Sequence, residues 1–181
     1  MRCQDNYLEQ VFEEPPLVAY SRNRNIKDTL VRAKVTNKAR KQRKLQGMKK
    51  CGKCTACSFI LEGKTVNTSK IKWRINSEVN CNSQNVIYLL ECDKEKCKKK
   101  YIGETERCFR DRINEHLNYA RNNKSKHTTG EHFNLPGHTW HNMNFTILEK
   151  VKENNVIYRQ EREKFYIRKF NTFYDGLNKK P

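Results

Sequence analysis

The chain has 181 residues, of which 35% are hydrophobic and 32% are charged, and its formal net charge is +18. This length suits one compact domain with extensions rather than two full domains, and so few apolar residues predict that part of the chain is extended or disordered until a partner binds. No apolar run approaches the ~18 residues that a membrane span needs, and the first residues do not resemble a signal peptide, so the sequence argues against a membrane protein.

Residues 1–50 form a basic extension that we expect to be partly helical, over 26–35, or disordered. Between Ser21 and Lys50, twelve Lys or Arg residues face one acid, Asp28, which gives this stretch a net charge of +11. Such a field favours nucleic acid or an anionic membrane surface as partner. Its charge run is either a solvated face or a nuclear-import or nucleic-acid-binding segment. In the second case the contact residues are Arg40, Lys41, Arg43 and Lys44.

Residues 51–83 form a cysteine-rich segment with few apolar residues. Without a secretion signal, its cysteines are better explained as thiols or metal ligands in a reducing compartment than as disulfides. Four of them have a spacing that could supply thiolates to a zinc ion, although unliganded thiols explain them equally well: Cys51, Cys54, Cys57 and Cys81.

From residue 84 to 181 the pattern predicts a folded α/β (α+β) domain, with a small antiparallel β-sheet of about three strands flanked by helices. An apolar, β-branched run around Tyr88 and a second run that ends at Gly103 form a hairpin, which brings Tyr88 and Tyr101 close together. Thr105 resembles a helix cap, with acids in the first turn. The expected elements after the hairpin (86–103) are a helix over about 105–121, a His-containing loop over about 122–142, a strand over 145–148 and a helix over about 158–170.

The first of these helices carries two polar side chains beside its apolar face. The face consists of Phe109, Ile113, Leu117 and Ala120, and His116 falls at its edge. Arg112 lies one turn earlier on the same side, so both heads can reach one point. A snorkelling arginine and a satisfied half-buried histidine are the alternative.

Glu163 lies in the middle of an apolar face of the last helix, ahead of Tyr166, Ile167 and Phe170. Burial of an unpaired carboxylate is costly, so Glu163 should have an arginine or a metal ion as partner. A structural ion pair with Arg112 or Arg159 is the simpler alternative.

These residues resemble the GIY-YIG nuclease domain. Tyr101-Ile102-Gly103 is a complete second signature, and Val86-Ile87-Tyr88 resembles the first with valine in place of glycine. The spacing of Thr105, Arg112 and His116 is similar to the first helix of the family, and Arg162-Glu163 to its metal-binding segment. Gly176-Leu177-Asn178 resembles the closing segment, in which an Asn supports the site.

The resemblance implies a DNA endonuclease with one divalent metal ion, Mg²⁺ or Mn²⁺, held by Glu163. A carboxylate oxygen suits Mg²⁺, which keeps most of its waters. By this resemblance Arg112 holds the scissile phosphate, Tyr88 is the general base, and Tyr101 and His116 position or relay the proton. Because an unperturbed tyrosine has a pKa of ~10, we expect nearby cations to lower that of Tyr88, and Lys100, His116 and the metal ion are the candidates.

A structural zinc site is predicted from two cysteines that lie between the two signatures and two histidines that follow them. Cys92 and Cys97 have a Cys-x₄-Cys spacing, and His132 and His138 have a His-x₅-His spacing. Free cysteines and loop histidines are the alternative, and His127 or His141 could substitute for either histidine.

This arrangement of cysteines and histidines resembles the endonuclease of Penelope-like retroelements, as does the segment ahead of the domain. The resemblance implies the carboxy-terminal part of such a protein, or a decayed or domesticated copy of one. The active form is expected to be a nuclear enzyme that nicks double-stranded DNA to expose a 3′ hydroxyl for a reverse transcriptase, with element RNA as a further partner. The alternatives are a zinc-stabilised nucleic-acid-binding module that has lost cleavage, and a basic structural protein or membrane-surface adaptor.

Overall fold

The computed structural model describes residues 20, 26, 46–68, 71–124, 126–152 and 155–179. The chain divides into two units, Met1–Lys41 and Gln42–Pro181, and all the elements given below belong to the second. The basic residues Arg40, Lys41, Arg43 and Lys44 lie outside the described residues, as does the predicted helix over 26–35 apart from Ile26.

A three-stranded antiparallel sheet forms the centre of the second unit, in the order β6-β5-β7. Strand β5 (Val86–Cys92) lies between β6 (Lys100–Thr105) and β7 (Met143–Lys150). All but one of the seven residues of β5 are buried, as expected for a central strand covered on both faces. The predicted hairpin and third strand are therefore confirmed.

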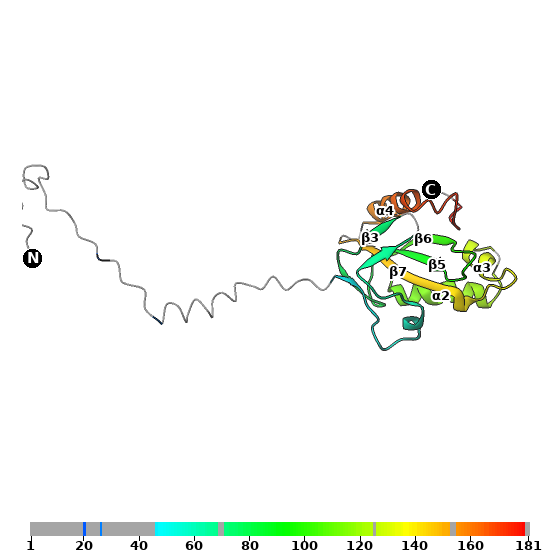
Figure 1. Cartoon of the computed structure of the whole chain (residues 1–181), viewed down its shortest axis with the longest axis horizontal. Helices are drawn as coiled ribbons and strands as arrows, with labels where there is room; N and C mark the ends of the chain where they lie inside the picture. Colours follow the sequence, from blue (N-terminus) through cyan, green and yellow to red (C-terminus); the bar gives the residue numbers. More distant parts are fainter. Residues whose placement is uncertain are drawn as a thin grey trace, which may run out of the picture. The chain divides into compact units, whose positions relative to one another are not determined.

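Helices α2 (Phe109–Arg121) and α4 (Val156–Lys169) cover opposite faces of this sheet (Figure 1). Tyr88 of β5 packs on Phe109 of α2, with ring centroids 5.3 Å apart. Its neighbour Ile87 points to the other face, where Glu149, its partner on β7, contacts Arg162 of α4. The mixed α/β architecture agrees with the predicted fold class.

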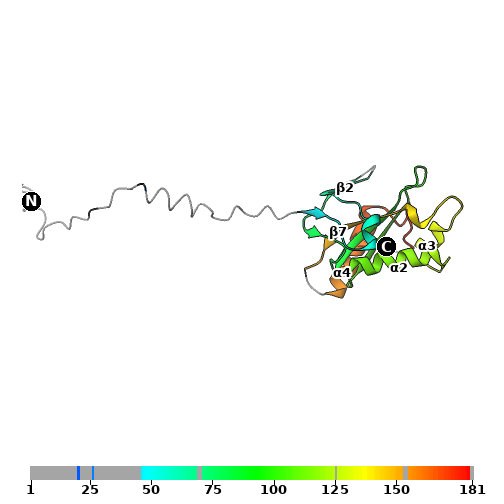
Figure 2. The same cartoon turned by 90° about the horizontal axis from the view of Figure 1, so that it is seen from below.

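Part of the predicted His-containing loop is helical. The short helix α3 (Thr128–Phe133) packs beside α2, and a 3₁₀ turn, η2 (Trp140–Asn142), leads into β7 (Figure 2). Gly130 makes this packing possible, because a Cβ at that position would lie 2.5 Å from the carbonyl oxygen of Lys124.

The cysteine-rich segment packs onto the central sheet within the same unit. Its elements are β1 (Gly47–Met48) paired in parallel with β4 (Glu78–Val79), the hairpin of β2 (Thr65–Asn67) and β3 (Lys72–Arg74), and the 3₁₀ turn η1 (Thr55–Phe59). Leu61 donates its backbone N–H to the Phe145 carbonyl at 3.0 Å, and the Trp73 indole donates to the Leu148 carbonyl at 3.3 Å. Both contacts attach the segment to β7.

The prediction that Thr105 caps the first helix is wrong. Thr105 is the last residue of β6, where it pairs with Val86, and its hydroxyl accepts a hydrogen bond from the Arg107 backbone at 3.2 Å. Pairing with the buried strand β5 keeps Thr105 extended, so α2 begins only at Phe109. None of the described helices is long and apolar enough to cross a membrane.

Candidate active site and metal centres

Three predicted site residues meet at the hydroxyl of Tyr88. Arg112 donates a hydrogen bond from Nε to this oxygen at 2.8 Å, and Nε2 of His116 lies 2.8 Å from it. Tyr88 and His116 are both buried, whereas Arg112 is half-buried. The i, i+4 spacing on α2 thus aims both heads at one point, as predicted, and His116 is more deeply buried than an edge position suggested.

His116 has a second partner that the sequence did not reveal. Its Nδ1 lies 3.0 Å from the hydroxyl of Thr129, which is buried in α3. The sequence does not indicate that Thr129 belongs to the site, because it lies in a segment expected to be a loop. Only the packing of α3 on α2 brings it next to His116.

Tyr101 and Gly103 complete the surroundings of Tyr88. Gly103 lies directly opposite Tyr88 in the β5–β6 ladder, and the two tyrosine rings are tilted with centroids 6.4 Å apart. A Cβ on Gly103 would lie 2.6 Å from Cζ of Tyr88 and 2.8 Å from Cε1 of Tyr101. The glycine of the second signature therefore provides the space in which both rings lie.

The electrostatics of Tyr88 differ from expectation. Burial, followed by the nearby Tyr101, raises the pKa of Tyr88 well above its usual value, and Arg112 opposes this shift. The expectation that Lys100 and His116 lower this pKa is wrong in this structure, because the pKa is raised and the cation that opposes the rise is Arg112. Lys100 lies 3.8 Å from the carboxylate of Glu91. Burial, followed by Arg112, lowers the pKa of His116 well below its usual value, so the imidazole is neutral at pH 7.

Glu163 lies half-buried on α4 and forms no ion pair with another described residue. The alternative of an ion pair with Arg112 or Arg159 does not hold, because Arg112 contacts Glu115 at 2.8 Å and Arg159 contacts Glu104 and Glu106. Burial, followed by repulsion from Glu104, raises the pKa of Glu163 to about 7. A half-buried carboxylate without its own cation fits the chemistry of a metal ligand.

Asn178 holds the open edge of β6 rather than facing the tyrosines. Its side-chain oxygen accepts a hydrogen bond from the Ile102 backbone N–H at 2.9 Å, and its amide donates to the Ile102 carbonyl at 2.8 Å. The preceding residue, Leu177, donates its N–H to the Lys100 carbonyl at 2.8 Å. The closing segment therefore pairs with the edge strand that carries Tyr101 and Gly103.

The predicted zinc ligands Cys92, Cys97, His132 and His138 lie together, with one ligand atom of each within 4.8 Å of the others. Both ring nitrogens of His138 are buried, and neither has a hydrogen-bond partner in the described part of the chain. Burial, followed by His138 and Lys99, lowers the pKa of His132 to about 4, so the ring is neutral, as a metal ligand must be. These four donors fit a Cys₂His₂ zinc site.

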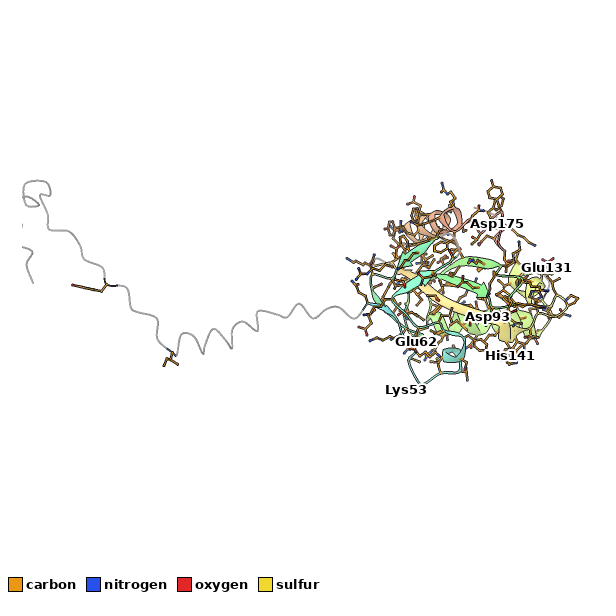
Figure 3. The ribbon with its side chains drawn as sticks, in the orientation of Figure 1. Lys53, Glu62, Asp93, Glu131, His141 and Asp175 are labelled. Carbon is orange, nitrogen blue, oxygen red and sulfur yellow. The ribbon has the colours of Figure 1, made fainter. Side chains whose placement is uncertain are left out.

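The alternative histidines lie elsewhere. His127 stacks on Tyr119, with ring centroids 3.8 Å apart and an interplanar angle of 3°. His141 is exposed beside Trp140 (Figure 3).

The second predicted set, Cys51, Cys54, Cys57 and Cys81, also lies together. Four of its sulfur–sulfur distances are 3.4–3.6 Å. Tetrahedral zinc with Zn–S bonds of ~2.3 Å needs sulfurs about 3.8 Å apart. The seven cysteines that the structure describes are all free thiols, so the cluster fits a Cys₄ zinc site.

This cysteine cluster is joined directly to the start of α2. The helix has no side-chain cap at Cys108. Instead, Arg110 donates its backbone N–H to the Cys81 carbonyl at 2.8 Å, and Phe109 donates to the Ser83 carbonyl at 3.0 Å. The loop that carries Cys81 thus accepts hydrogen bonds from two N–H groups in the first turn of α2, which have no partner within the helix. The second of these groups, that of Arg110, lies two residues before Arg112 of the candidate active site.

Comparison with known proteins agrees with this geometry. The sequence pattern of the GIY-YIG catalytic domain matches residues 84–178, which contain every residue of the site around Tyr88. No curated protein and no solved structure matches the chain. GIY-YIG nucleases are generally metal-dependent and act on nucleic acid. Because the match spans more than half of the sequence, this chain belongs to the GIY-YIG nuclease family.

Proposed function

We propose that this protein is a metal-dependent DNA endonuclease that nicks double-stranded DNA. The observation that carries the proposal is the Tyr88 hydroxyl, which contacts both a permanently charged arginine and a neutral histidine. Together they give its oxygen a proton acceptor and a positive charge, which are what a tyrosine general base needs.

Each side chain then has a separate task. Tyr88 takes a proton from the attacking water, and His116 receives the phenolic proton at Nε2. Arg112, which is already at the Tyr88 oxygen, binds the scissile phosphate. Tyr101 lies beside the Tyr88 ring, and Asn178 holds the strand that carries Tyr101, β6, by its hydrogen bonds to Ile102.

Glu163 would hold the catalytic Mg²⁺ or Mn²⁺. Its half-buried carboxylate without an ion-pair partner fits this role, because Mg²⁺ is held in proteins by one or two carboxylates with water and phosphate oxygens. Such an ion acts as a Lewis acid on the departing oxygen when bound. The two cysteine-containing clusters would hold structural zinc.

A supercoiled-plasmid nicking assay with Mg²⁺ or Mn²⁺ tests the proposal. We expect Tyr88→Phe to slow nicking by about 10²–10⁴-fold, the range typical of a lost general base. Glu163→Gln should abolish nicking at Mg²⁺ or Mn²⁺ concentrations that support the wild type, whereas Glu161→Gln, which changes an exposed carboxylate of the same helix, should nick at the wild-type rate. If the wild type binds DNA without nicking it, the protein is instead a zinc-stabilised nucleic-acid-binding module.

The biological setting that we propose is a retroelement of the Penelope-like type, within the nucleus. Support comes from the position of Cys92 and Cys97 between the two signatures, the paired histidines that complete their cluster, and the basic extension. A reverse transcriptase and element RNA would then be partners. Extension of the nicked strand by a reverse transcriptase tests this, because a nick that leaves a 3′ phosphate could not be extended.

A further inference from the structure

Thr129 is a buried hydroxyl to which the catalytic scheme above gives no task. It lies in the first turn of α3, with 2% of its surface exposed, and its Oγ1 is 3.0 Å from Nδ1 of His116. Gly130 allows α3 to approach α2 closely at this point, and the Asn134 amide binds the Gly130 carbonyl at 2.6 Å. The hydroxyl is therefore held against the imidazole by close packing.

The donors and acceptors around Tyr88 limit the possible directions of its hydrogen bonds. Arg112 can only donate, so the Tyr88 oxygen accepts its Nε–H. The Tyr88 hydroxyl has one hydrogen, and Nε2 of His116, 2.8 Å away, is where it can be donated. A neutral imidazole carries one donor and one acceptor. If Nε2 accepts, Nδ1 carries the hydrogen and donates it to Thr129.

We propose that Thr129 is a positioning residue that holds His116 in the Nδ1–H tautomer, so that Nε2 is free to accept the proton of Tyr88. The proton leaves the Tyr88 oxygen and binds Nε2, which gives a phenolate and an imidazolium. The imidazolium keeps its Nδ1–H bond to Thr129, and the phenolate keeps its bond from Arg112. This inference rests on the proposed function, in which the Tyr88 phenolate then takes a proton from the attacking water.

The Cys92-Cys97-His132-His138 cluster anchors the helix that carries Thr129. His132 follows Thr129 by three residues on α3, and its Nε2 lies 3.5 Å from the sulfur of Cys97, in the β5–β6 connection. A zinc ion at this cluster would tie α3 to the hairpin that carries both tyrosines. Two features therefore hold the Thr129 hydroxyl in place beside His116: the close packing of α3 on α2, and the contact of α3 with the β5–β6 connection through His132.

Thr129→Val tests the proposal, because valine fills the same space without an acceptor for Nδ1–H. Thr129→Ser keeps the hydroxyl and serves as the conservative variant. Thr172→Val is the matched control, since Thr172 is also buried but its hydroxyl has no hydrogen-bond partner among the described residues. The first readout is the tautomer of His116, from the ¹⁵N shifts of its ring nitrogens in the zinc-loaded protein. The second is the nicking reaction, with kcat and KM separated.

We expect wild type, Thr129→Ser and Thr172→Val to show the Nδ1–H tautomer, and Thr129→Val to shift toward Nε2–H. For Thr129→Val, kcat should fall by about 10- to 100-fold, as when other partners that orient a functional histidine are lost, with KM nearly unchanged. An unchanged tautomer in Thr129→Val, or an Nε2–H tautomer in the wild type, would overturn the inference. Absence of nicking in every protein would remove the proposed function, and the ¹⁵N shifts would still decide the role of Thr129.

Discussion

Gly103 lies directly opposite Tyr88 in the β5–β6 ladder, and the Tyr88 ring occupies the space that a side chain at position 103 would fill. Tyr101, two residues before Gly103 on the same face of β6, borders the same space. The glycine of the second signature and the tyrosine of the first are therefore one structural unit, in which the missing Cβ sets the position of the phenolic oxygen between Arg112 and His116.

Gly103→Ala should displace the Tyr88 ring. The added Cβ would lie 2.6 Å from Cζ of Tyr88, and the neighbours are the buried ring itself and Tyr101 rather than a flexible chain end. Overpacking of this kind costs about 1–3 kcal/mol, which urea unfolding should show. Nicking should fall much further than stability, because the hydroxyl moves away from Arg112 and His116. A variant that loses stability but nicks normally would contradict this account.

Much of the fold followed from local sequence patterns. A continuous apolar run with β-branched residues around Tyr88 predicted β5, and the apolar face of Phe109, Ile113 and Leu117 predicted α2, whose members are indeed buried. These signals are local, since each depends only on neighbouring residues. The start of α2 was wrong because pairing of Thr105 with Val86, a tertiary contact, outweighs the preference of threonine for a helix cap.

The partners of the charged groups could not be predicted in the same way. The helical spacing of Arg112 and His116 indicated that they point to one place, but not that His116 is neutral or that Thr129 binds its far side. Glu163 was expected to have a partner, and the arginines that could have paired with it are taken by Glu104, Glu106 and Glu115. Competition among several charges is decided by tertiary packing, which spacing does not encode.

Asn178→Ala should destabilise the edge of the sheet. The substitution leaves the buried N–H and carbonyl of Ile102 without the partners that Asn178 supplies at 2.9 and 2.8 Å. Unpaired buried polar groups cost about 1–3 kcal/mol each, so for these two groups we expect a loss of about 2–6 kcal/mol by urea unfolding and faster amide exchange at Ile102. Asn118→Ala, on the exposed face of α2, should change stability by less than about 0.5 kcal/mol. Equal stability of the two variants would show that water replaces Asn178 at no cost.

Cys81→Ser should loosen the start of α2 as well as release zinc. The Cys81 carbonyl accepts the backbone N–H of Arg110 at 2.8 Å, so a disordered cluster would leave the first turn without this cap. We expect metal analysis to give about two zinc ions per chain for wild type and one for the variant, with faster amide exchange at Phe109 and Arg110.

Cys97→Ser is the matched control for the cap. It should also lose one zinc ion, from the other cluster, but leave exchange at Phe109 and Arg110 slow. Fast exchange in both variants would mean that α2 responds to general destabilisation rather than to the Cys81 loop.

Stability should fall in acid because of His116. Burial lowers the pKa of His116 well below its usual value in the folded chain, whereas in the unfolded chain it titrates near ~6.5. Below about pH 6.5 the unfolded chain therefore binds a proton that the folded chain does not, and the free energy of unfolding falls by up to ~1.4 kcal/mol per pH unit.

The variant His116→Gln tests this, because it removes the titratable imidazole but leaves both metal clusters and Glu163 in place. Between pH 7.5 and 5.5, urea unfolding should show that the wild type loses about 1 kcal/mol more than the variant. Equal losses would mean that His116 takes up its proton over the same pH range in the folded and unfolded chains, so that burial does not lower its pKa.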